Sequence, residues 1–224
     1  MDSKIPRAAL RVDALGLILA GRINTFLASA DAGLILAPGT ATAQPDLLLR
    51  INWIAENTLR WQAGWLFWLA VTLSFSWSYY ALGRHLNKTL PWVNLAIGLA
   101  LIAAAVDIVG VLINMVVLPT LASDLSTAQI LFLAMEKMAN ALTNVAAFGL
   151  YSFAGLLLLP AIFSTKDYPN WLRLLGVTEW SIASIATVLL IISPQLATIP
   201  LLISFALYAP WVWGSAYWLL RERA

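Results

Sequence analysis

Five stretches of largely apolar residues, each long enough to cross a lipid bilayer as a helix, dominate this sequence. They cover residues 61–82, 92–118, 139–163, 172–192 and 197–220. A helix needs about 20 apolar residues to cross a hydrocarbon core roughly 30 Å thick. Charged residues make up only 11% of the chain, whereas soluble domains carry about 25%. The sequence therefore predicts an all-α fold, a polytopic integral membrane helical bundle, with residues 1–224 forming a single transmembrane domain.

The N-terminal apolar segment, residues 12–36, is a marginal sixth span. It carries Asp13, Arg22 and Asp31, and a central charge costs about 2.5 to 3.5 kcal/mol on insertion scales. A secretory signal peptide cleaved after residues 28–30 is the alternative interpretation. Because Arg22 interrupts the apolar stretch that a signal peptide requires, we favour a retained span and about six transmembrane helices.

The distribution of basic residues predicts the orientation of the chain. With six spans and both termini in the cytoplasm, nine basic residues face inward and three face outward. The inward set is Lys4, Arg7, Arg11, Arg84, Lys88, Lys166, Arg173, Arg221 and Arg223, and the outward set is Arg50, Arg60 and Lys137. Cytoplasmic loops are enriched in Lys and Arg. The expected location is the inner membrane of a bacterial cell, or a thylakoid membrane.

Two features are expected on the outer side. Residues 47–59 alternate apolar positions with Arg50, Asn52 and Glu56, a pattern typical of a short amphipathic helix lying on the outer surface of the bilayer. Residues 126–138 are expected to continue without a break into the fourth span, and so to extend that helix beyond the membrane.

Polar residues on the third span share one helical stripe with small residues. Helical spacing places Asp107 and Asn114 in line with Ala100, Ala103 and Gly110. Small residues permit close helix contacts inside a membrane, so this stripe is expected to face the bundle interior. Asp107 then either binds a ligand or proton, or only fixes the packing through neighbouring hydroxyl, amide or arginine groups.

A second polar stripe follows the fourth span. Glu136, Asn140 and Tyr151 fall along one helical face, which predicts an entry path with Glu136 at its mouth and Tyr151 near its floor. The alternative is that the amides of this stripe only join neighbouring helices by hydrogen bonds.

Glu179 on the fifth span aligns with small residues and is also expected to face inward. Arg22 lies opposite the acidic stripe of its own segment. Its expected partner is therefore a carboxylate on another helix, Asp107 or Glu179.

The residue types exclude several kinds of chemistry. The chain has no cysteine and one histidine, His85, so neither a thiolate metal site nor a two-histidine haem is expected. His85 lies in a polar segment that predicts a solvated loop. No catalytic or metal-binding motif is recognisable. The basic residues sit at predicted helix ends, so the sequence does not indicate nucleic-acid binding.

Aromatic stripes on residues 61–79 and 208–215 either pack against other helices or hold a lipid, quinone or pigment.

Three hypotheses for function remain. The first is a non-enzymatic membrane protein that binds a small or amphipathic ligand inside the bundle, for transport or sensing. Its candidate site residues are Asp107, Glu179, Arg22, Asn114, Glu136, Asn140 and Tyr151. The second is an accessory or scaffold subunit of a larger photosynthetic or respiratory membrane complex, with other membrane subunits or further copies of itself as partners. A membrane enzyme is the third hypothesis. It ranks last because no residue pattern identifies a reaction.

Overall fold

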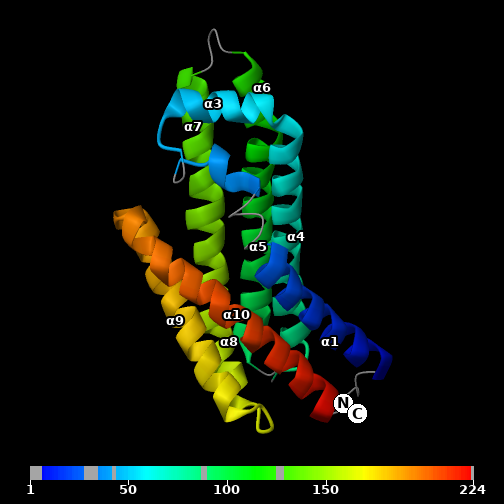
Figure 1. The fold of residues 1–224 in the computed structure, drawn as a ribbon. Coiled ribbons are helices and arrows are strands. Elements are labelled where there is room, and N and C mark those ends of the chain that lie inside the picture. Colours follow the sequence, from blue (N-terminus) through cyan, green and yellow to red (C-terminus); the bar gives the residue numbers. More distant parts are fainter. Residues whose placement is uncertain (1–6, 28–34, 42–43, 87–89, 125–128, 223–224) are drawn as a thin grey trace.

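The computed structural model describes residues 7–27, 35–41, 44–86, 90–124 and 129–222, and within these ranges the regular structure is entirely helical (Figure 1). The elements are α1 (Arg7–Arg22), η1 (Ile23–Leu27), η3 (Ala37–Gly39), α3 (Leu47–Glu56), α4 (Thr58–Gly83), α5 (Pro91–Leu112), η4 (Ile113–Val117), α6 (Leu118–Ser123), α7 (Gln129–Asn140), η5 (Ala141–Ala147), α8 (Phe148–Ser164), α9 (Asn170–Ile192) and α10 (Pro194–Glu222). The all-α prediction is confirmed for these residues.

Three long helices stand upright beside one another (Figure 1). One is α4, the second runs through α5, η4 and α6 over 33 residues, and the third runs through α7, η5 and α8 over 36 residues. The π-helical segments η4 and η5 widen a turn without ending the helix. The prediction that the fourth span begins well before residue 139 is confirmed from Gln129 onward, while residues 126–128 lie outside the described ranges.

Contacts between α4 and α5 follow an antiparallel register. The Trp61 indole donates to the carbonyl oxygen of Asn114 (2.6 Å), and the Ser76 hydroxyl donates to that of Ala100 (3.3 Å). Between them the Thr72 hydroxyl donates to Asp107 (2.6 Å). The two helices therefore lie side by side over most of their length.

In the half of the molecule away from α3, six helices form a closed ring. In order around the ring they are α4, α5, α8, α9, α10 and α1, and each contacts the next, with α1 returning to α4. The ring encloses aromatic side chains from four of these helices, with the Phe75 ring 4.4 Å from that of Tyr208 and 5.2 Å from that of Tyr151. The predicted aromatic stripes of the second and sixth spans thus pack on one another.

The short helix α3 lies across the other end of the bundle (Figure 1). It begins where the Asp46 side chain accepts hydrogen bonds from the backbone N–H groups of Leu48 and Leu49, a typical N-cap. Ile51 and Ile54 are buried in a second apolar core with residues of α4, α6 and α7. The predicted amphipathic helix is therefore present, but Arg50 lies on its buried face and Leu48 is exposed.

Four helices of the described chain are long and apolar enough to cross a membrane. They comprise the two long composite helices together with α9 and α10. The 26 residues of α4 have the length, but many are Trp, Tyr and Ser, which lower its mean hydropathy. The first predicted span, residues 12–36, is described only in part, because the helix α1 has 16 residues and residues 28–34 lie outside the described ranges. The structure thus supports a helical membrane bundle, and the count of six spans stays a prediction.

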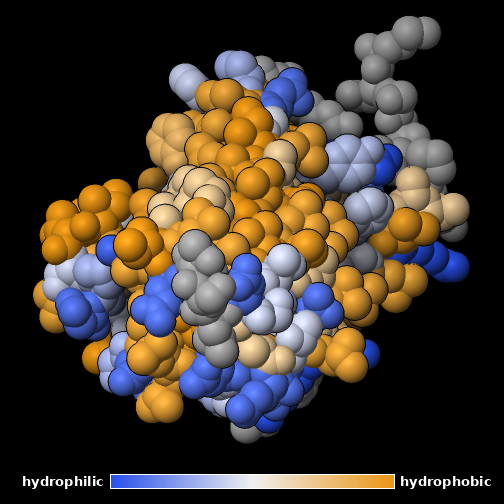
Figure 2. Space-filling view, turned by 90° about the horizontal axis from the view of Figure 1, so that it is seen from above, coloured by the Kyte–Doolittle hydropathy of each residue, from blue (hydrophilic) through white to orange (hydrophobic). Residues whose placement is uncertain are grey.

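The outer surface of these helices is rich in large apolar side chains. Leu101 and Ile102 on α5, Ile191 on α9 and Leu202 on α10 are each more than half exposed, and Figure 2, seen from the α3 end, shows broad hydrophobic areas with hydrophilic patches between them. Monomeric soluble proteins rarely expose apolar patches of such extent. This surface suits a lipid environment.

Candidate functional site

The small-residue stripe of α5 faces the interior, as predicted. Ala100 and Ala103 are fully buried, and Asp107 and Asn114 keep only 6% and 3% of their surface exposed. Gly110 completes the stripe, and a Cβ at this position would overlap the Thr143 hydroxyl oxygen of η5. The absence of a side chain at Gly110 therefore brings α5 and η5 into close contact beside Asp107.

Asp107 is held through only one of its two oxygens. The Thr72 hydroxyl of α4 donates to Oδ2 (2.6 Å), whereas the fully buried Oδ1 has no hydrogen-bond partner among the described residues. The Thr143 hydroxyl lies beside the carboxylate and interacts with it, but the geometry falls short of a regular hydrogen bond, and Thr143 has no other partner among the described residues. Two unsatisfied oxygens thus lie next to each other in the bundle interior.

Both helices that flank these oxygens widen into π-helix nearby. In η4 the Leu118 N–H donates to the carbonyl oxygen of Ile113, five residues earlier, and η5 contains Thr143 itself. Asn114 lies in η4, where its amide donates to the carbonyl oxygen of Gly110 (3.0 Å) and its own carbonyl accepts from Trp61. π-helical turns occur frequently at functional sites. Here η5 holds Thr143 beside the buried acid, and η4 follows on the same helix as Asp107.

Tyr151 of α8 lies close to the same group. Its hydroxyl donates to the carbonyl oxygen of Thr72 (3.2 Å), the residue whose side chain holds Asp107, and lies 3.4 Å from the Ser76 hydroxyl. Tyr79 donates in turn to the Tyr151 carbonyl. The structure therefore brings together three of the predicted site residues, Asp107, Asn114 and Tyr151, around Thr72 and Gly110.

Glu179 forms a separate buried acidic position. Its Oε1 accepts a hydrogen bond from Ser204 of α10 (2.9 Å), and its Oε2 has no partner among the described residues. The side chain is 1% exposed, as the predicted inward orientation requires. Between the described residues of the two sites, no direct hydrogen bond joins Glu179 to Asp107.

Glu136 does not form the mouth of an entry path. It makes a buried, two-pronged ion pair with Arg50 of α3, with Nε 3.0 Å from Oε1 and Nη2 2.8 Å from Oε2. The remaining Arg50 nitrogen, Nη1, donates to the carbonyl oxygens of Gln44 and Pro45. The predicted entry path is wrong at this end, because the carboxylate joins α3 to α7.

Asn140 also departs from the predicted path. Its side chain is exposed on the outer surface of α7, where it accepts from the Asn144 amide at 3.4 Å. The buried face of this helix runs through Glu136, Ala139 and Thr143, so Asn140 lies beside that face and not on it.

Arg22 does not pair with a buried acid. Its side chain is exposed at the end of α1, and in the described structure no ion pair or hydrogen bond links it to Asp107 or Glu179. The expectation of an Arg22 ion pair with either residue is wrong, because Asp107 and Glu179 each accept from a neighbouring hydroxyl instead.

A buried histidine was not expected from the sequence. His85 is 5% exposed, and its Nε2 lies 2.9 Å from Oδ2 of Asp13 on α1, while Arg84 approaches the other Asp13 oxygen at 3.5 Å. The predicted solvated loop is wrong at this residue, because α1 packs along the end of α4 and covers it.

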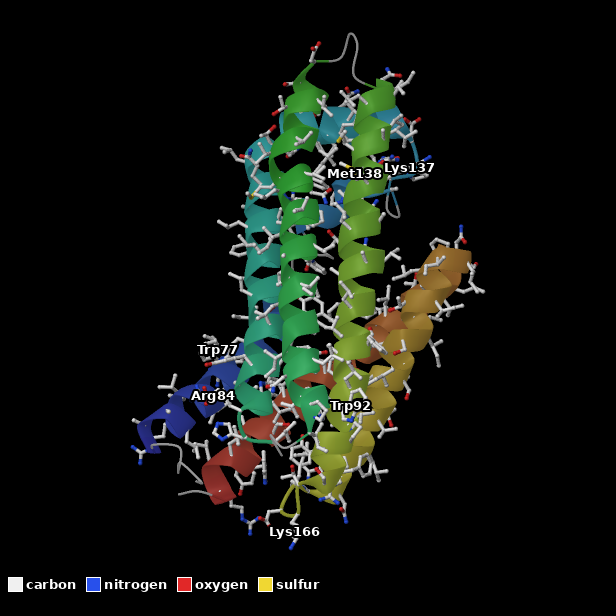
Figure 3. The ribbon with its side chains drawn as sticks, turned by 180° about the vertical axis from the view of Figure 1, so that it is seen from behind. Trp77, Arg84, Trp92, Lys137, Met138 and Lys166 are labelled. Atoms are coloured by element: carbon white, nitrogen blue, oxygen red, sulfur yellow. The ribbon has the colours of Figure 1, made fainter. Side chains whose placement is uncertain are left out.

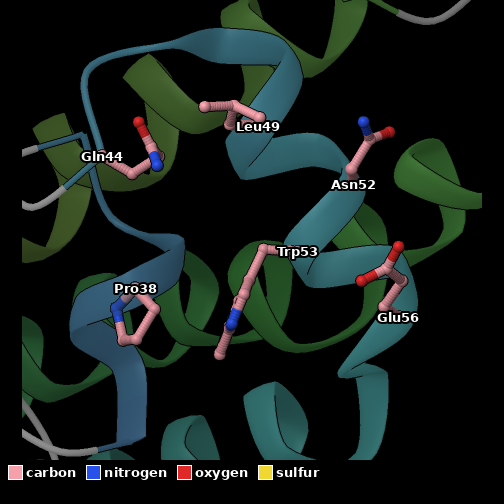
Figure 4. Close-up of a pocket in the computed structure, with 6 residues that line it drawn as sticks. All are labelled: Pro38, Gln44, Leu49, Asn52, Trp53 and Glu56. Carbon is pink, nitrogen blue, oxygen red and sulfur yellow. The ribbon is translucent and has the colours of Figure 1, made fainter.

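A surface pocket of about 500 Å³ lies on the exposed face of α3 (Figure 4). Leu49, Asn52, Trp53 and Glu56 line it from one helix, and Pro38 and Gln44 close the other side. None of the predicted site residues borders this pocket.

Comparison with protein-family models, with curated proteins and with solved structures finds no match to this chain. Among the described residues, no group of three or more His, Cys, Asp and Glu side chains is arranged to hold a metal ion.

Proposed function

We propose that this chain is a non-enzymatic integral membrane protein that binds a small ligand at Asp107, inside its helical bundle, for transport or sensing. The observation that carries the proposal is the pair of buried oxygens, Asp107 Oδ1 and Thr143 Oγ1, which lie side by side and form no well-formed hydrogen bond with any described residue. A buried polar group without a partner costs about 1 to 3 kcal/mol. A ligand that satisfies both oxygens would recover that cost.

The surroundings of Asp107 favour a small ligand over an amphipathic one. Thr72 is 1% exposed and Ala103 is fully buried beside the acid, and the contact at Gly110 leaves no space for a methyl group. A large ligand would have to separate α5 from α4 and η5. A small ligand needs only a change in the orientation of the Thr143 hydroxyl.

The test is a thermal-shift screen of the purified protein in a mild detergent, with Asp107→Asn alongside the parent. Asparagine keeps the shape and one acceptor oxygen but removes the charge. We expect at least one small solute to raise the Tm of the parent and not that of Asp107→Asn. The control is Glu56→Gln, an exposed acid on α3, which should respond as the parent does. Equal responses of the parent and Asp107→Asn to every solute would contradict the proposal.

The same preparation tests the second hypothesis. Mass analysis of a gently solubilised sample would reveal other membrane subunits bound in fixed proportion, and such a result would favour an accessory role. A protein purified alone that retains a solute response at Asp107 would favour ligand binding.

We further propose that the chain crosses the inner membrane six times, with both termini in the cytoplasm. The register between α4 and α5 supports a crossing by α4, because a helix that lies along a spanning helix from Asn114 to Ala100 must enter the same layer. A second antiparallel register joins α1 to α4, with Asn24 bonded to Ser74 (2.7 Å) and Asp13 to His85. Thus α1 begins at the end of the bundle where α4 finishes.

The labelled basic residues support the same orientation. Figure 3 shows Lys137 towards one end of the bundle and Arg84 and Lys166 near the other. The end with Arg84 and Lys166 also carries Arg173, which donates hydrogen bonds to the carbonyl oxygens of Thr165 and Lys166, so it is the more basic one. By the positive-inside tendency it is the cytoplasmic end.

Reporter fusions test this orientation. Fusions after Asp2 and at Ala224 should both report a cytoplasmic position, and one after Thr40, between η3 and α3, should report the outer side. A cytoplasmic signal at Thr40 would contradict a crossing by α4. An external signal at Asp2 would remove the first span and leave five.

A further inference from the structure

We propose that the ligand bound at Asp107 is a monovalent metal cation of the size of Na⁺, held between Asp107 Oδ1 and Thr143 Oγ1. The inference rests on the proposed function, since it names the chemical class of the ligand at the same site. Four features of the site lead to it: the donor atoms, the charge, the backbone geometry and the available space.

The available donors are all oxygen atoms. Besides the two unpaired side-chain oxygens, the carbonyl oxygen of Ala139 approaches Gly110, one turn from Asp107, at 3.0 Å from the position a Cβ would take. Carboxylate, hydroxyl and carbonyl oxygens are the ligands of hard cations, while soft metals require sulfur or imidazole. Asp107 and Thr143 are each at least nine-tenths buried, so their oxygens depend on a partner from inside the bundle.

The charge of the site matches a single positive charge. Asp107 is one carboxylate, and its described neighbours on α4, η5 and α8 are Thr72, Thr143 and Tyr151, of which none is basic. A monovalent ion would neutralise this carboxylate. A divalent ion would leave one uncompensated charge in a low-dielectric interior, which is strongly unfavourable.

The backbone around the site is locally widened. The segments η4 and η5 lie on the two helices that meet at Gly110, and a π-helical turn alters the direction of carbonyl groups that a regular helix would aim along its axis. In membrane transport proteins, Na⁺ is commonly coordinated by backbone carbonyls at interrupted helices together with side-chain oxygens. Here the interruption is a π-helical segment on each of two neighbouring helices.

The space at the site favours a small ion. Because Thr143 sits directly over Gly110, an organic cation cannot enter between α5 and η5 without separating them. A small ion instead bridges Asp107 Oδ1 and Thr143 Oγ1, which lie near one another without a well-formed hydrogen bond.

The experiment compares Tm in NaCl with Tm in choline chloride at equal ionic strength, on the full chain in detergent. We expect the parent to melt at a higher temperature in NaCl, with a Tm that rises with the logarithm of the Na⁺ concentration, as ligand linkage requires. Thr143→Val, which removes the hydroxyl and retains the shape, should abolish the difference. The matched control is Thr178→Val on α9. Its hydroxyl donates to the Leu174 carbonyl of its own helix, so this variant should retain the full difference.

The outcomes separate this inference from the proposed function. Equal Tm values of the parent in the two salts would overturn the cation site. If another solute, such as CaCl₂ or a small neutral molecule, then raises the Tm of the parent but not of Asp107→Asn, the proposed function stands with a different ligand. If no solute does so, both the cation site and the proposed function fail.

A sodium effect that survives in Thr143→Val would place the cation elsewhere and would also overturn the inference. Should Asp107→Asn fail to fold, the two threonine variants still decide the question.

Discussion

Replacing Glu136 by alanine is expected to lower the free energy of unfolding by about 3 to 5 kcal/mol. The change leaves the Arg50 guanidinium buried, with 4% of its side chain exposed, and without its carboxylate. Removing one partner of a buried ion pair costs far more than the pair itself contributes, because the remaining charge stays out of water. Thermal or denaturant unfolding in a fixed detergent measures the loss.

The neighbouring Lys137→Ala provides the matched control. Lys137 is exposed on the same helix, so its removal should change stability by no more than about 0.5 kcal/mol. The double variant Arg50→Met with Glu136→Leu should recover much of the loss, because apolar residues of similar size often replace a buried ion pair without cost. If Glu136→Ala unfolds like the parent, the pair is exposed to solvent and α3 is not fixed to α7.

The second large effect is expected at Gly155. The Trp180 ring of α9 lies directly against this residue of α8, so a Cβ would overlap the ring. Gly155→Ala should therefore destabilise the protein by about 1 to 3 kcal/mol, the usual cost of overpacking. A changed tryptophan emission spectrum should accompany the loss, because the Trp180 ring must move.

Gly98→Ala on α5 is the matched control, since no other side chain or distant backbone atom of the described residues lies within 4 Å of a Cβ at that position. Alanine has the higher helix propensity, by about 1 kcal/mol, so Gly98→Ala should leave stability unchanged or raise it. If the two variants lose stability equally, the α8–α9 contact at Trp180 is looser than described.

The contact at Gly155 is one of a set that the sequence did not reveal. At six described glycines, a Cβ would meet a tryptophan ring at 3.0 Å or less. The pairs are Gly16 with Trp77, Gly21 with Trp213, Gly39 with Trp61, Gly155 with Trp180, Gly176 with Trp211, and Gly214 with Trp171. In most of these pairs the two residues come from different helices, so neither sequence spacing nor hydropathy can predict the match.

Local patterns predicted the helices and the orientation of their small-residue faces. Apolar length located the helices from α4 to α10, and regular spacing placed Asp107 and Asn114 in the interior, because both depend only on residues within one helix. Interfacial belts of membrane proteins are rich in tryptophan, but a tryptophan near the end of a predicted span is not always at the surface of this protein. Trp92 and Trp171 are exposed as an interfacial position requires, whereas Trp61 and Trp218 are buried.

Contacts between residues far apart in the sequence were not predicted. Arg50 and Glu136 are 86 positions apart, and Asp13 and His85 are 72 apart. Arg50, Glu136 and His85 were each expected at a solvated position, because the helix that covers each of them lies in a distant part of the chain. For Asn140 the fault was the assumed face, since Ala139, and not Asn140, follows Glu136 on the buried side of α7.

The closed ring of helices has a consequence for synthesis. The first helix of the ring, α1, and the last, α10, are neighbours, and the Trp213 indole of α10 donates to the Ile18 carbonyl of α1 at 3.2 Å. Chains are made from the N-terminus, so one flank of α1 has no protein partner until the final helix leaves the ribosome. Membrane insertion of this protein therefore includes a closing step in which α10 meets α1, a helix made much earlier, and a chain truncated before α10 would expose that flank of α1 permanently.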